Sequence, residues 1–358
     1  MCYEIMKILI SDSQHPNAVA PQYADYLGKQ PKLTVTRFAH DDLYIQWTKR
    51  SLAHKLCARL TPKVVERNIN TELIRLVSTT KPNVVWVFKG GQFFPNTIQS
   101  VKETGSLLVN LNGDHPWNFF QRGSGNANVT NSFHLYDVFF TYSRSIAAEV
   151  AKRYPEISTH VLPFGHRVTN SQYEQLTQIP ESKRVCFIGN PDRLRAAFLD
   201  KIVASGIPID VYGFKWSRHL QKKNNLRVFN QANGQKYYET LRKYRVQLNL
   251  FRPQNANSHN MRSFETPACG GVMLAPDSEE HRVFFNEGKE AFFFNSPENA
   301  IEQCRHILEL PDDEILKIRD RARLRSVQSG YSYNDRAKTA LQIIHQFHLQ
   351  RSGKQPSP

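Results

Sequence analysis

Short apolar runs alternate with amphipathic stretches along almost the whole chain. The runs are rich in Val, Ile, Leu and Phe, and they lack the apolar–polar alternation of a half-exposed strand. Runs of this kind, separated by helices, are typical of a parallel sheet covered on both faces. We therefore predict strands at residues 6–11, 33–38, 83–88, 107–111, 138–142 and 160–162, and again at 184–188, 209–212, 226–229, 246–251, 272–275 and 291–294.

The pattern stops after Pro163 and starts again at Arg184, and 358 residues are too many for one ordinary core. We predict an α/β protein with two doubly wound, Rossmann-like domains that face each other across a cleft. In open parallel sheets ligands bind beyond the carboxyl ends of the strands, so the cleft is the expected site. The predicted parts are an N-terminal domain at 1–165, a linker at 166–183 in which one short helix is possible, a second domain at 184–330, a closing helix at 331–350 and a disordered tail at 351–358.

Composition narrows the class of protein. Hydrophobic residues make up 40% of the chain and charged residues 22%, as in ordinary globular proteins. No apolar run is long enough to cross a bilayer, and the first residues lack the apolar core of a signal peptide. The five cysteines are far apart and form no CxxC pair, which argues against a disulfide framework and a zinc site. We expect a cytoplasmic protein, either free or peripheral at the inner face of the membrane.

The net charge of +15 leaves several partners open: a solvated basic surface, an anionic lipid surface, an anionic acceptor or nucleic acid. No zinc finger or RNA-binding signature is present, which makes nucleic acid unlikely as the partner. Basic residues cluster at 49–67, where Leu52, Leu56 and Leu60 recur at helical spacing. This stretch fits an interfacial amphipathic helix, or a helix whose leucines pack against a sheet. We favour packing.

The segment 248–271 is the most informative for function. It reads as the end of a strand, a polar loop, and a helix that opens near Ser263 and ends at two glycines. Free N–H groups at a helix N-terminus attract anions, and Arg252 and Arg262 flank the loop. Glu265 can accept two ribose hydroxyls, as acidic residues do in dinucleotide folds. The predicted ligand is therefore a nucleotide.

With these residues in place, the chain resembles the two-domain GT-B glycosyltransferases, and most closely the CgeB-like proteins of the glycosyl transferases group 1 set. The residues that carry the resemblance lie at 185–189 (VCFIG), 261–271 (MRSFETPACGG) and 285–294 (FNEGKEAFFF), with 81–91 (KPNVVWVFKGG) the clearest N-terminal piece. The resemblance implies the GT-B architecture and a nucleotide-sugar donor, UDP- or GDP-linked, on the second domain.

Retaining members of such families carry two glutamates separated by seven residues, and the second contacts the ribose. Glu265 matches that second position, whereas the first falls on Asn257, so this chain departs from the pattern. An amide can hydrogen-bond a sugar hydroxyl but brings no charge. Retention or inversion therefore stays open.

The resemblance also implies a diphosphate site after the first strand of the second domain. Gly189 lets backbone approach an anion, and an arginine can fork onto phosphate; we favour Arg193 over Arg195. The predicted donor-binding residues are Gly189, Asn190, Arg193, Asn257, Asn260, Met261, Arg262, Ser263, Phe264 and Glu265.

The N-terminal domain is expected to supply the acceptor side and the acid–base group. Asp114 and His115 follow a predicted buried strand, and loops at strand ends commonly carry chemistry. We predict Asp114 as general base and His115 as a contact to donor sugar or phosphate; the alternative is that Asp114 caps a turn. The predicted acceptor-side residues are Ser11, His15, Asn17, Gly90 and Gly91, although the two glycines could serve only a turn.

A metal-independent reaction without a cofactor is expected. No Asp-x-Asp pair lies in a suitable loop, and the pairs at 41–42 and 312–313 read as charges at helix N-termini. The predicted function is transfer of a sugar from a nucleoside diphosphate to a glycan, lipid-linked or other acceptor. The alternatives are a nucleotide-sugar epimerase of the same fold, and a non-enzymatic basic protein that binds nucleic acid or membrane.

Overall fold

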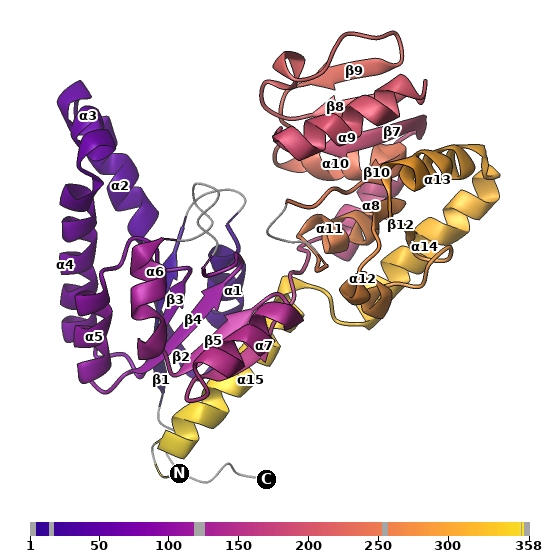
Figure 1. Cartoon of the computed structure of the whole chain (residues 1–358). Helices are drawn as coiled ribbons and strands as arrows, with labels where there is room; N and C mark the ends of the chain where they lie inside the picture. The colour runs from indigo at the N-terminus through magenta and orange to yellow at the C-terminus, as the bar shows by residue number, and fades with distance from the viewer. Residues whose placement is uncertain (1–4, 14–17, 118–125, 253–256, 352, 354–358) are drawn as a thin grey trace. The chain divides into compact units, whose positions relative to one another are not determined.

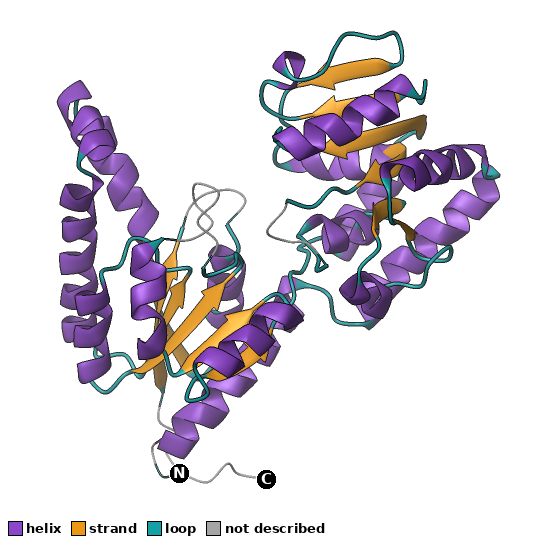
Figure 2. Ribbon diagram, viewed as in Figure 1, coloured by secondary structure: helices purple, strands orange, loops and turns teal. Residues whose placement is uncertain are grey.

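The computed structural model describes residues 5–13, 18–117, 126–252, 257–351 and 353. The chain forms two compact units, one from Met1–Pro163 with Tyr333–Pro358 and one from Phe164–Ser332. Each unit contains a six-stranded parallel sheet between layers of helices (Figures 1 and 2). The prediction of an α/β chain with two Rossmann-like domains is confirmed.

The first sheet has the order β2-β1-β3-β4-β5-β6, and every pair in it is parallel. Its strands are β1 (Met6–Asp12), β2 (Leu33–Ala39), β3 (Val84–Phe88), β4 (Leu107–Asn112), β5 (Val138–Thr141) and β6 (Ser158–Val161). Its helices are α1 (Ala20–Leu27), α2 (His40–Lys49), α3 (Leu52–Leu60), α4 (Pro62–Thr80), α5 (Pro95–Glu103), α6 (Ala127–Ser132), the 3-10 turn η1 (Phe133–Leu135), α7 (Arg144–Arg153) and α15 (Tyr333–Arg351).

The second sheet has the order β12-β11-β10-β7-β8-β9 and is also parallel throughout. Its strands are β7 (Ser182–Ile188), β8 (Ile209–Tyr212), β9 (Leu226–Phe229), β10 (Tyr244–Leu248), β11 (Met273–Pro276) and β12 (Phe292–Phe294). Its helices are α8 (Asn170–Thr177), α9 (Arg193–Ala204), the 3-10 turn η2 (Trp216–Arg218), α10 (Gln235–Lys243), α11 (Arg262–Ala268), α12 (Glu279–Phe284), α13 (Pro297–Glu309) and α14 (Asp312–Gln328).

The central strands are apolar on both faces because each face meets a layer of helices. In β3, Val84 and Trp86 belong to the core that includes α1 and α15, whereas Val85 and Val87 belong to the core that includes α4 and α5. Successive side chains of a strand point to opposite faces, so in β3 both sets of side chains meet apolar neighbours. The unbroken apolar runs in the sequence have this origin.

The ends of the second unit differ from the predicted domain limits. The segment 166–183, predicted as a linker, contains helix α8, which packs against α10 within the second unit. The closing helix α15 returns to the first unit, where Ala337, Ala340 and Ile344 are buried in the core beside α1. Of the predicted tail, residues 352 and 354–358 lie outside the described residues.

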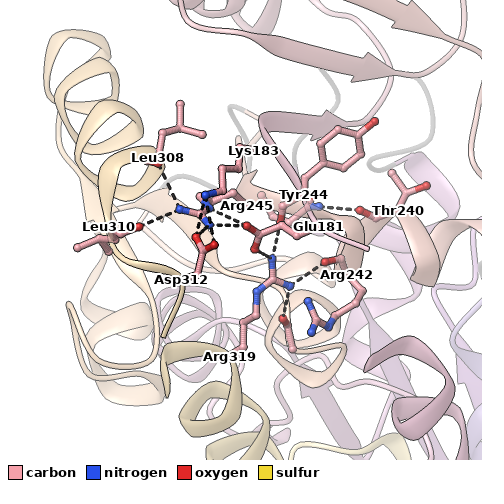
Figure 3. Close-up of polar contacts among 12 residues, drawn as sticks. Glu181, Lys183, Thr240, Arg242, Tyr244, Arg245, Leu308, Leu310, Asp312 and Arg319 are labelled. Atoms are coloured by element: carbon pink, nitrogen blue, oxygen red, sulfur yellow. Dashed lines mark hydrogen bonds and ion pairs between the residues drawn. The ribbon is translucent and has the colours of Figure 1, made fainter. Parts of the chain in front are cut away.

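An ion-pair cluster joins the amino ends of β7 and β10 to the helices that follow the second sheet in sequence (Figure 3). Glu181 accepts from Arg245 Nε at 2.7 Å and from Arg319 Nη2 at 2.6 Å. Arg245 also donates to the backbone oxygen of Leu310 at 2.8 Å and pairs with Asp312. Both guanidiniums are buried, and burial lowers the pKa of Arg319 to about 10. Glu181 and Asp312 thus neutralise two buried cations, which would otherwise cost several kcal/mol each.

The basic stretch at 49–67 corrects one expectation. It forms α3 and parts of α2 and α4, but Leu52, Leu56 and Leu60 are exposed instead of packed against the sheet. The sheet face is already covered by α4, whose Val65, Ile69 and other apolar residues lie in the core. None of the helices in the described ranges combines the length and apolarity that crossing a bilayer requires.

Candidate functional site

The strands β7 and β10 are neighbours in the second sheet, but the chain leaves them in opposite directions. From β7 it runs to β8 and β9 on one side, and from β10 to β11 and β12 on the other. Their carboxyl ends therefore form a topological switch point, and open α/β sheets bind ligands at such a point. The loops that follow are 189–192 after β7 and 249–261 after β10. The latter loop contains the motif that the sequence analysis singled out.

Arg195 occupies this switch point. Its guanidinium donates to the backbone oxygen of Leu250 at 2.8 Å and to that of Asn190 at 3.3 Å, so it joins the β10 and β7 loops. Asp192 caps α9 by accepting from the Arg195 N–H at 2.9 Å, which sets the first turn of the helix against the sheet. Only 4% of Arg195 is exposed. Burial first, and then the like charge of Arg262, lower the pKa of Arg195 to about 10.

Arg262 and Arg252 add positive charge beside it. Both repel the Arg195 cation electrostatically. Neither has a carboxylate within ion-pair distance among the described residues, and the buried Nε of Arg262 has no hydrogen-bond partner there. Like charges are held together in a protein only when other contacts compensate, and a bound anion compensates directly. The three guanidiniums are suited to a diphosphate, which an arginine can bind through two N–H groups.

Glu265 lies in the first turn of α11 and is buried. Its Oε2 accepts from the Tyr237 hydroxyl at 2.6 Å, the one hydrogen bond of this carboxylate within the described part of the chain. Burial raises the pKa of Glu265, while Tyr237, Arg262 and Arg167 oppose that rise. The tyrosine fixes one oxygen, so the second oxygen remains available as an acceptor for ligand hydroxyls.

A buried polar network holds the loop before α11 in place. Asn260 and Asn249 pair through their amides, with Asn260 Nδ2 donating to Asn249 Oδ1 at 2.8 Å. The backbone N–H of Asn260 donates to Ser263 Oγ at 3.2 Å, and Ser263 Oγ lies 2.8 Å from His281 Nε2. His281 Nδ1 lies 2.8 Å from the Pro276 carbonyl oxygen, which can only accept. The ring is therefore protonated on Nδ1, and Nε2 accepts from Ser263.

Burial explains why His281 stays neutral in this network. The ring is fully buried, and burial lowers the pKa of His281 to about 4. A second histidine, His259, contacts Glu280 at 2.5 Å, and Glu280 also accepts from Ser258 at 2.7 Å. The loop is thus attached to α12 at two places. Rigid attachment allows a loop to present Arg262 and Glu265 with little loss of conformational entropy on binding.

Steric contacts explain why residue 189, the first after β7, is a glycine. A Cβ on Gly189 would lie 2.9 Å from the Phe187 ring, and the Gly189 oxygen accepts from Trp216 Nε1 at 2.6 Å. Gly213, after β8, has φ +157°, and a Cβ there would lie 2.1 Å from the Gly189 oxygen. Asn190 Oδ1 accepts from the Phe214 N–H at 3.3 Å. Gly189 and Asn190 therefore shape the loop that leads into α9, which carries Arg195.

The structure places the other predicted donor-side residues differently. Arg193 is exposed, whereas Arg195, two positions on, is buried at the switch point. Asn257 is exposed with φ +61°, a backbone conformation that asparagine tolerates. Phe264 requires a correction, because its ring is fully buried in the aromatic cluster of the core and cannot face a ligand. The Met261 oxygen accepts from the Glu265 N–H at 3.0 Å and so begins α11.

The first unit has its own switch point, between β1 and β3. Asp114 follows β4 and forms an ion pair with Lys89 at 2.5 Å, which joins the loops after β3 and β4. Among the described residues the Asp114 side chain accepts from Lys89 and from no N–H of the turn, and its own N–H donates to Asn112 Oδ1 at 3.0 Å. His115 Nε2 lies 3.4 Å from Glu149. Asp114 and His115 are thus oriented side chains at the carboxyl edge of the sheet.

Of the predicted acceptor-side residues, Ser11 requires a correction. It is buried, and its Oγ accepts from the Phe88 N–H at 2.7 Å, so it joins β1 to β3 and does not face solvent. Gly90 has φ +91°, and a Cβ on Gly91 would lie 2.8 Å from the Asn126 amide. The backbone turn after β3 therefore explains why both residues are glycine. His15 and Asn17 lie outside the described residues.

Sequence reasoning missed two residues of the candidate site. Tyr237 lies on α10, well before the loop that it supports, and no short motif connects it to Glu265. The sequence favoured Arg193 over Arg195, although Asp192, as the N-cap of α9, indicates where the first turn of the helix begins. A capped helix start fixes which face of the first turn meets the sheet.

Among the described residues, no group of three or more His, Cys, Asp or Glu side chains could hold a metal ion. The positive side chains that interact electrostatically at the switch point are Arg195, Arg252 and Arg262.

Comparison with known proteins is consistent with this geometry. Residues 193–342, which include α9 and α11, match the family model described as glycosyl transferase-like. No curated protein matches the chain. Sucrose-phosphate synthase from Thermosynechococcus elongatus superposes with a TM-score of 0.69 and 11% identity, covering 96% of this chain and 100% of that chain.

Two further solved structures are similar in fold. HepE from Anabaena, in complex with UDP and glucose, has a TM-score of 0.64 and 11% identity, covering 95% of this chain and 99% of its own. UDP-GlcNAc 2-epimerase from Neisseria meningitidis, bound to UDP-GlcNAc, has a TM-score of 0.59 and 13% identity, covering 95% and 100%. At such identities the likeness concerns the fold alone, and the CgeB-like subgroup stays a prediction. The chain is a two-domain protein of the GT-B fold, glycosyl transferase-like over residues 193–342.

Proposed function

We propose that the protein is a glycosyltransferase that uses a nucleoside-diphosphate sugar as donor. The observation that carries the proposal is the group of guanidiniums at the switch point of the second unit, with Glu265 held beside Arg262. The glycosyl transferase-like match covers the same residues. Arg195 and Arg262 bind the diphosphate, and Glu265 accepts from the ribose hydroxyls with Tyr237 fixing its other oxygen.

The chemistry follows from where charge develops. When the bond between sugar and phosphate oxygen breaks, negative charge grows on the departing nucleoside diphosphate. Positive groups that are already oriented stabilise this charge, commonly by a few kcal/mol for each well-placed donor. Arg195 is oriented in this way by its hydrogen bonds to Leu250 and Asn190. We propose that the reaction needs neither a metal ion nor a cofactor.

The first unit is proposed to bind the acceptor. Asp114 acts as general base on the acceptor hydroxyl, and Lys89, at 2.5 Å, keeps its carboxylate oriented. His115 contacts the donor sugar or a phosphate. The acceptor is proposed to be a glycan or a lipid-linked glycan, and the protein's high positive charge suits an anionic one. A cytoplasmic location accords with such a donor.

The test is an incubation of the protein with a panel of UDP- and GDP-linked sugars. UDP-linked donors come first, because UDP is the nucleotide in the HepE complex and in the ligand of the Neisseria epimerase. Acceptor-dependent release of nucleoside diphosphate is the expected result. A changed sugar on an intact donor would mean epimerisation instead, and no nucleotide binding at all would favour a non-enzymatic role.

A pair of variants separates the proposed site from a general effect. Glu265→Gln keeps the shape but removes the charge that accepts both ribose hydroxyls, so donor affinity falls, by about tenfold for one charge-assisted hydrogen bond. Glu279→Gln on α12, an exposed glutamate of the same unit, leaves affinity unchanged. Equal affinity in both variants would remove Glu265 from the site.

A further inference from the structure

Helix α3 carries an apolar stripe that faces solvent. Leu52, Leu56 and Leu60 are exposed by 85%, 57% and 69%. At 3.6 residues per turn they span an arc of roughly 80° on one side of the helix. Val64, in the first turn of α4, and Ile45 on α2 are also exposed. Large apolar side chains that are exposed singly are ordinary, but a contiguous stripe marks an interaction surface.

The opposite side of α3 attaches the helix to its own unit. Ala58, roughly 200° around the helix from the middle of the stripe, is its one buried residue. The Tyr44 hydroxyl of α2 lies 3.4 Å from the Ala58 oxygen, and His54 meets the edge of Trp47 at 5.0 Å. Figure 1 shows α3 at the outer end of α2 and α4, beyond the sheet. The leucine side therefore points away from the core that holds the helix.

Basic side chains lie beside the stripe and on the segments that flank α3. Lys55 and Arg59 lie on α3 along one edge of it, at about −60° and −20° from Leu52. The exposed basic residues of the segment are Lys49, Arg50, Lys55, Arg59, Lys63 and Arg67, against one acidic residue between positions 43 and 67, Glu66. The surface thus combines apolar side chains with a concentrated positive charge.

We propose that α3 docks the protein on an anionic lipid bilayer, with the three leucines inserted at the level of the headgroups and the basic residues against lipid phosphates. An amphipathic helix with leucines on one side and Lys and Arg beside them binds at this depth, and each basic residue near an anionic surface contributes about a fivefold gain in binding. The inference goes beyond the proposed glycosyl transfer and does not depend on it.

Two other occupants fit the surface less well. Nucleic acid would engage the basic side chains but leave three leucines exposed to phosphate and water. A second copy of the chain would bury the leucines but bring two sets of six basic residues together, with one acidic residue in each set. The bilayer is the occupant that uses both features.

The experiment is co-sedimentation of the full chain with vesicles of phosphatidylcholine alone, or of phosphatidylcholine mixed with phosphatidylglycerol. Binding to the mixed vesicles that weakens with added salt is expected. The triple variant Leu52→Ser, Leu56→Ser, Leu60→Ser should lose at least about tenfold in binding, because it removes the inserted apolar area. The matched control is Leu316→Ser with Leu324→Ser on α14, two leucines that are also exposed, each by 53%, and it should bind like the unchanged protein.

A charge variant tests the second half of the proposal. Lys55→Gln, Arg59→Gln and Lys63→Gln together should lower binding to the mixed vesicles by about a hundredfold, fivefold for each charge. Circular dichroism and donor-nucleotide affinity, which reports on the second unit, should be the same for all variants, so a loss of vesicle binding is not a loss of fold.

Four results would overturn the proposal. They are equal binding of the leucine variant and the unchanged protein, equal binding to neutral and anionic vesicles, leucine-dependent self-association without lipid, and tighter binding to a DNA duplex than to the mixed vesicles. A failure of sugar transfer in the donor assay would leave the vesicle result untouched.

Discussion

Replacement of Arg195 by methionine should weaken nucleotide binding and change the unfolding free energy by no more than about 2 kcal/mol. The side chain is buried at the switch point, and its charge has two backbone acceptors, Leu250 and Asn190, with Asp192 3.5 Å from Nε. Methionine fills a similar volume and removes the charge. In the free protein the buried charge lowers stability, whereas in the proposed complex it binds phosphate.

The magnitudes can be worked out from the site. A fall in the pKa of Arg195 from 12.5 to about 10 means that the fold holds the charged form less favourably by about 3 kcal/mol, and this cost is present at every pH below about 10. Its removal is offset by the Leu250 oxygen, which loses its partner at 2.8 Å at a cost of about 1–3 kcal/mol. The net change in unfolding free energy is therefore within about 2 kcal/mol of zero. Loss of a charge-assisted bond to phosphate costs about 1.5–3 kcal/mol, or 10- to 150-fold in affinity.

The assay is calorimetric titration of UDP and GDP into Arg195→Met and into the control Arg193→Met, with urea unfolding of both. Arg193 lies in the same first turn but is exposed, so the control removes an equal charge from the same helix. Affinity should fall for the buried position and stay within about twofold for the exposed one, since screened surface charges contribute little.

The reverse order, with Arg193→Met losing affinity and Arg195→Met retaining it, would refute the geometric argument and restore the preference that the sequence suggested. A large loss of stability in Arg195→Met with unchanged affinity would assign Arg195 to the fold alone.

Three further predictions concern the second unit. The pKa of His281 is lowered to about 4 in the folded protein, against 6.5 in the unfolded chain, so the ring stays neutral when folded. The unfolding free energy should therefore fall by about 3 kcal/mol as the pH drops from about 6.5 to about 4. Urea unfolding of His281→Gln should show a smaller fall. Glu181→Ala leaves the buried Arg319 guanidinium without a carboxylate and Arg245 with Asp312 alone, and it should lower the unfolding free energy by about 3–5 kcal/mol. Asp313→Ala, in an exposed pair, should leave the unfolding midpoint unchanged. Gly213→Ala should lower the unfolding free energy more than Gly206→Ala. Both positions have a positive φ, which costs about 1–3 kcal/mol for a residue with a side chain, but only at 213 would the Cβ also overlap a backbone atom, the Gly189 oxygen.

The layered fold could be predicted from the sequence because its physical cause is local. A strand covered on both faces is mostly apolar, and β3 appears in the sequence as an unbroken apolar run at 84–88. The same reasoning could not show where the ends belong. Segment 166–183 is polar, yet α8 packs on α10 through one buried leucine, Leu176, and a few partly buried residues. One apolar position in a helix is too weak a pattern to distinguish from a linker.

The candidate site was predictable where its residues are adjacent in sequence and not elsewhere. Glu265 and Arg262 stand in one motif, so their proximity is fixed by a single helical turn. Arg193 and Arg195 are about 200° apart on the helix, and the choice between them depends on where β10 lies. Leucine spacing in α3 likewise predicted a helix but not which neighbour covers it, because α4 already occupies the sheet face. Packing partners distant in sequence decide such questions.

The two switch points of this chain differ in how far their charges are neutralised. In the first, Asp12 is paired with Arg37 and Asp114 with Lys89, each at 2.5 Å, so charges of opposite sign cancel. In the second, the described residues place Arg195, Arg252 and Arg262 against only Asp192 and Glu265, and the latter is directed toward Tyr237. A net charge of +15 spread over the chain attracts anions weakly and everywhere, whereas guanidiniums in excess of carboxylates at a buried strand end favour one place. Local neutralisation, and not total charge, is therefore the basis on which we propose the second switch point as the diphosphate site.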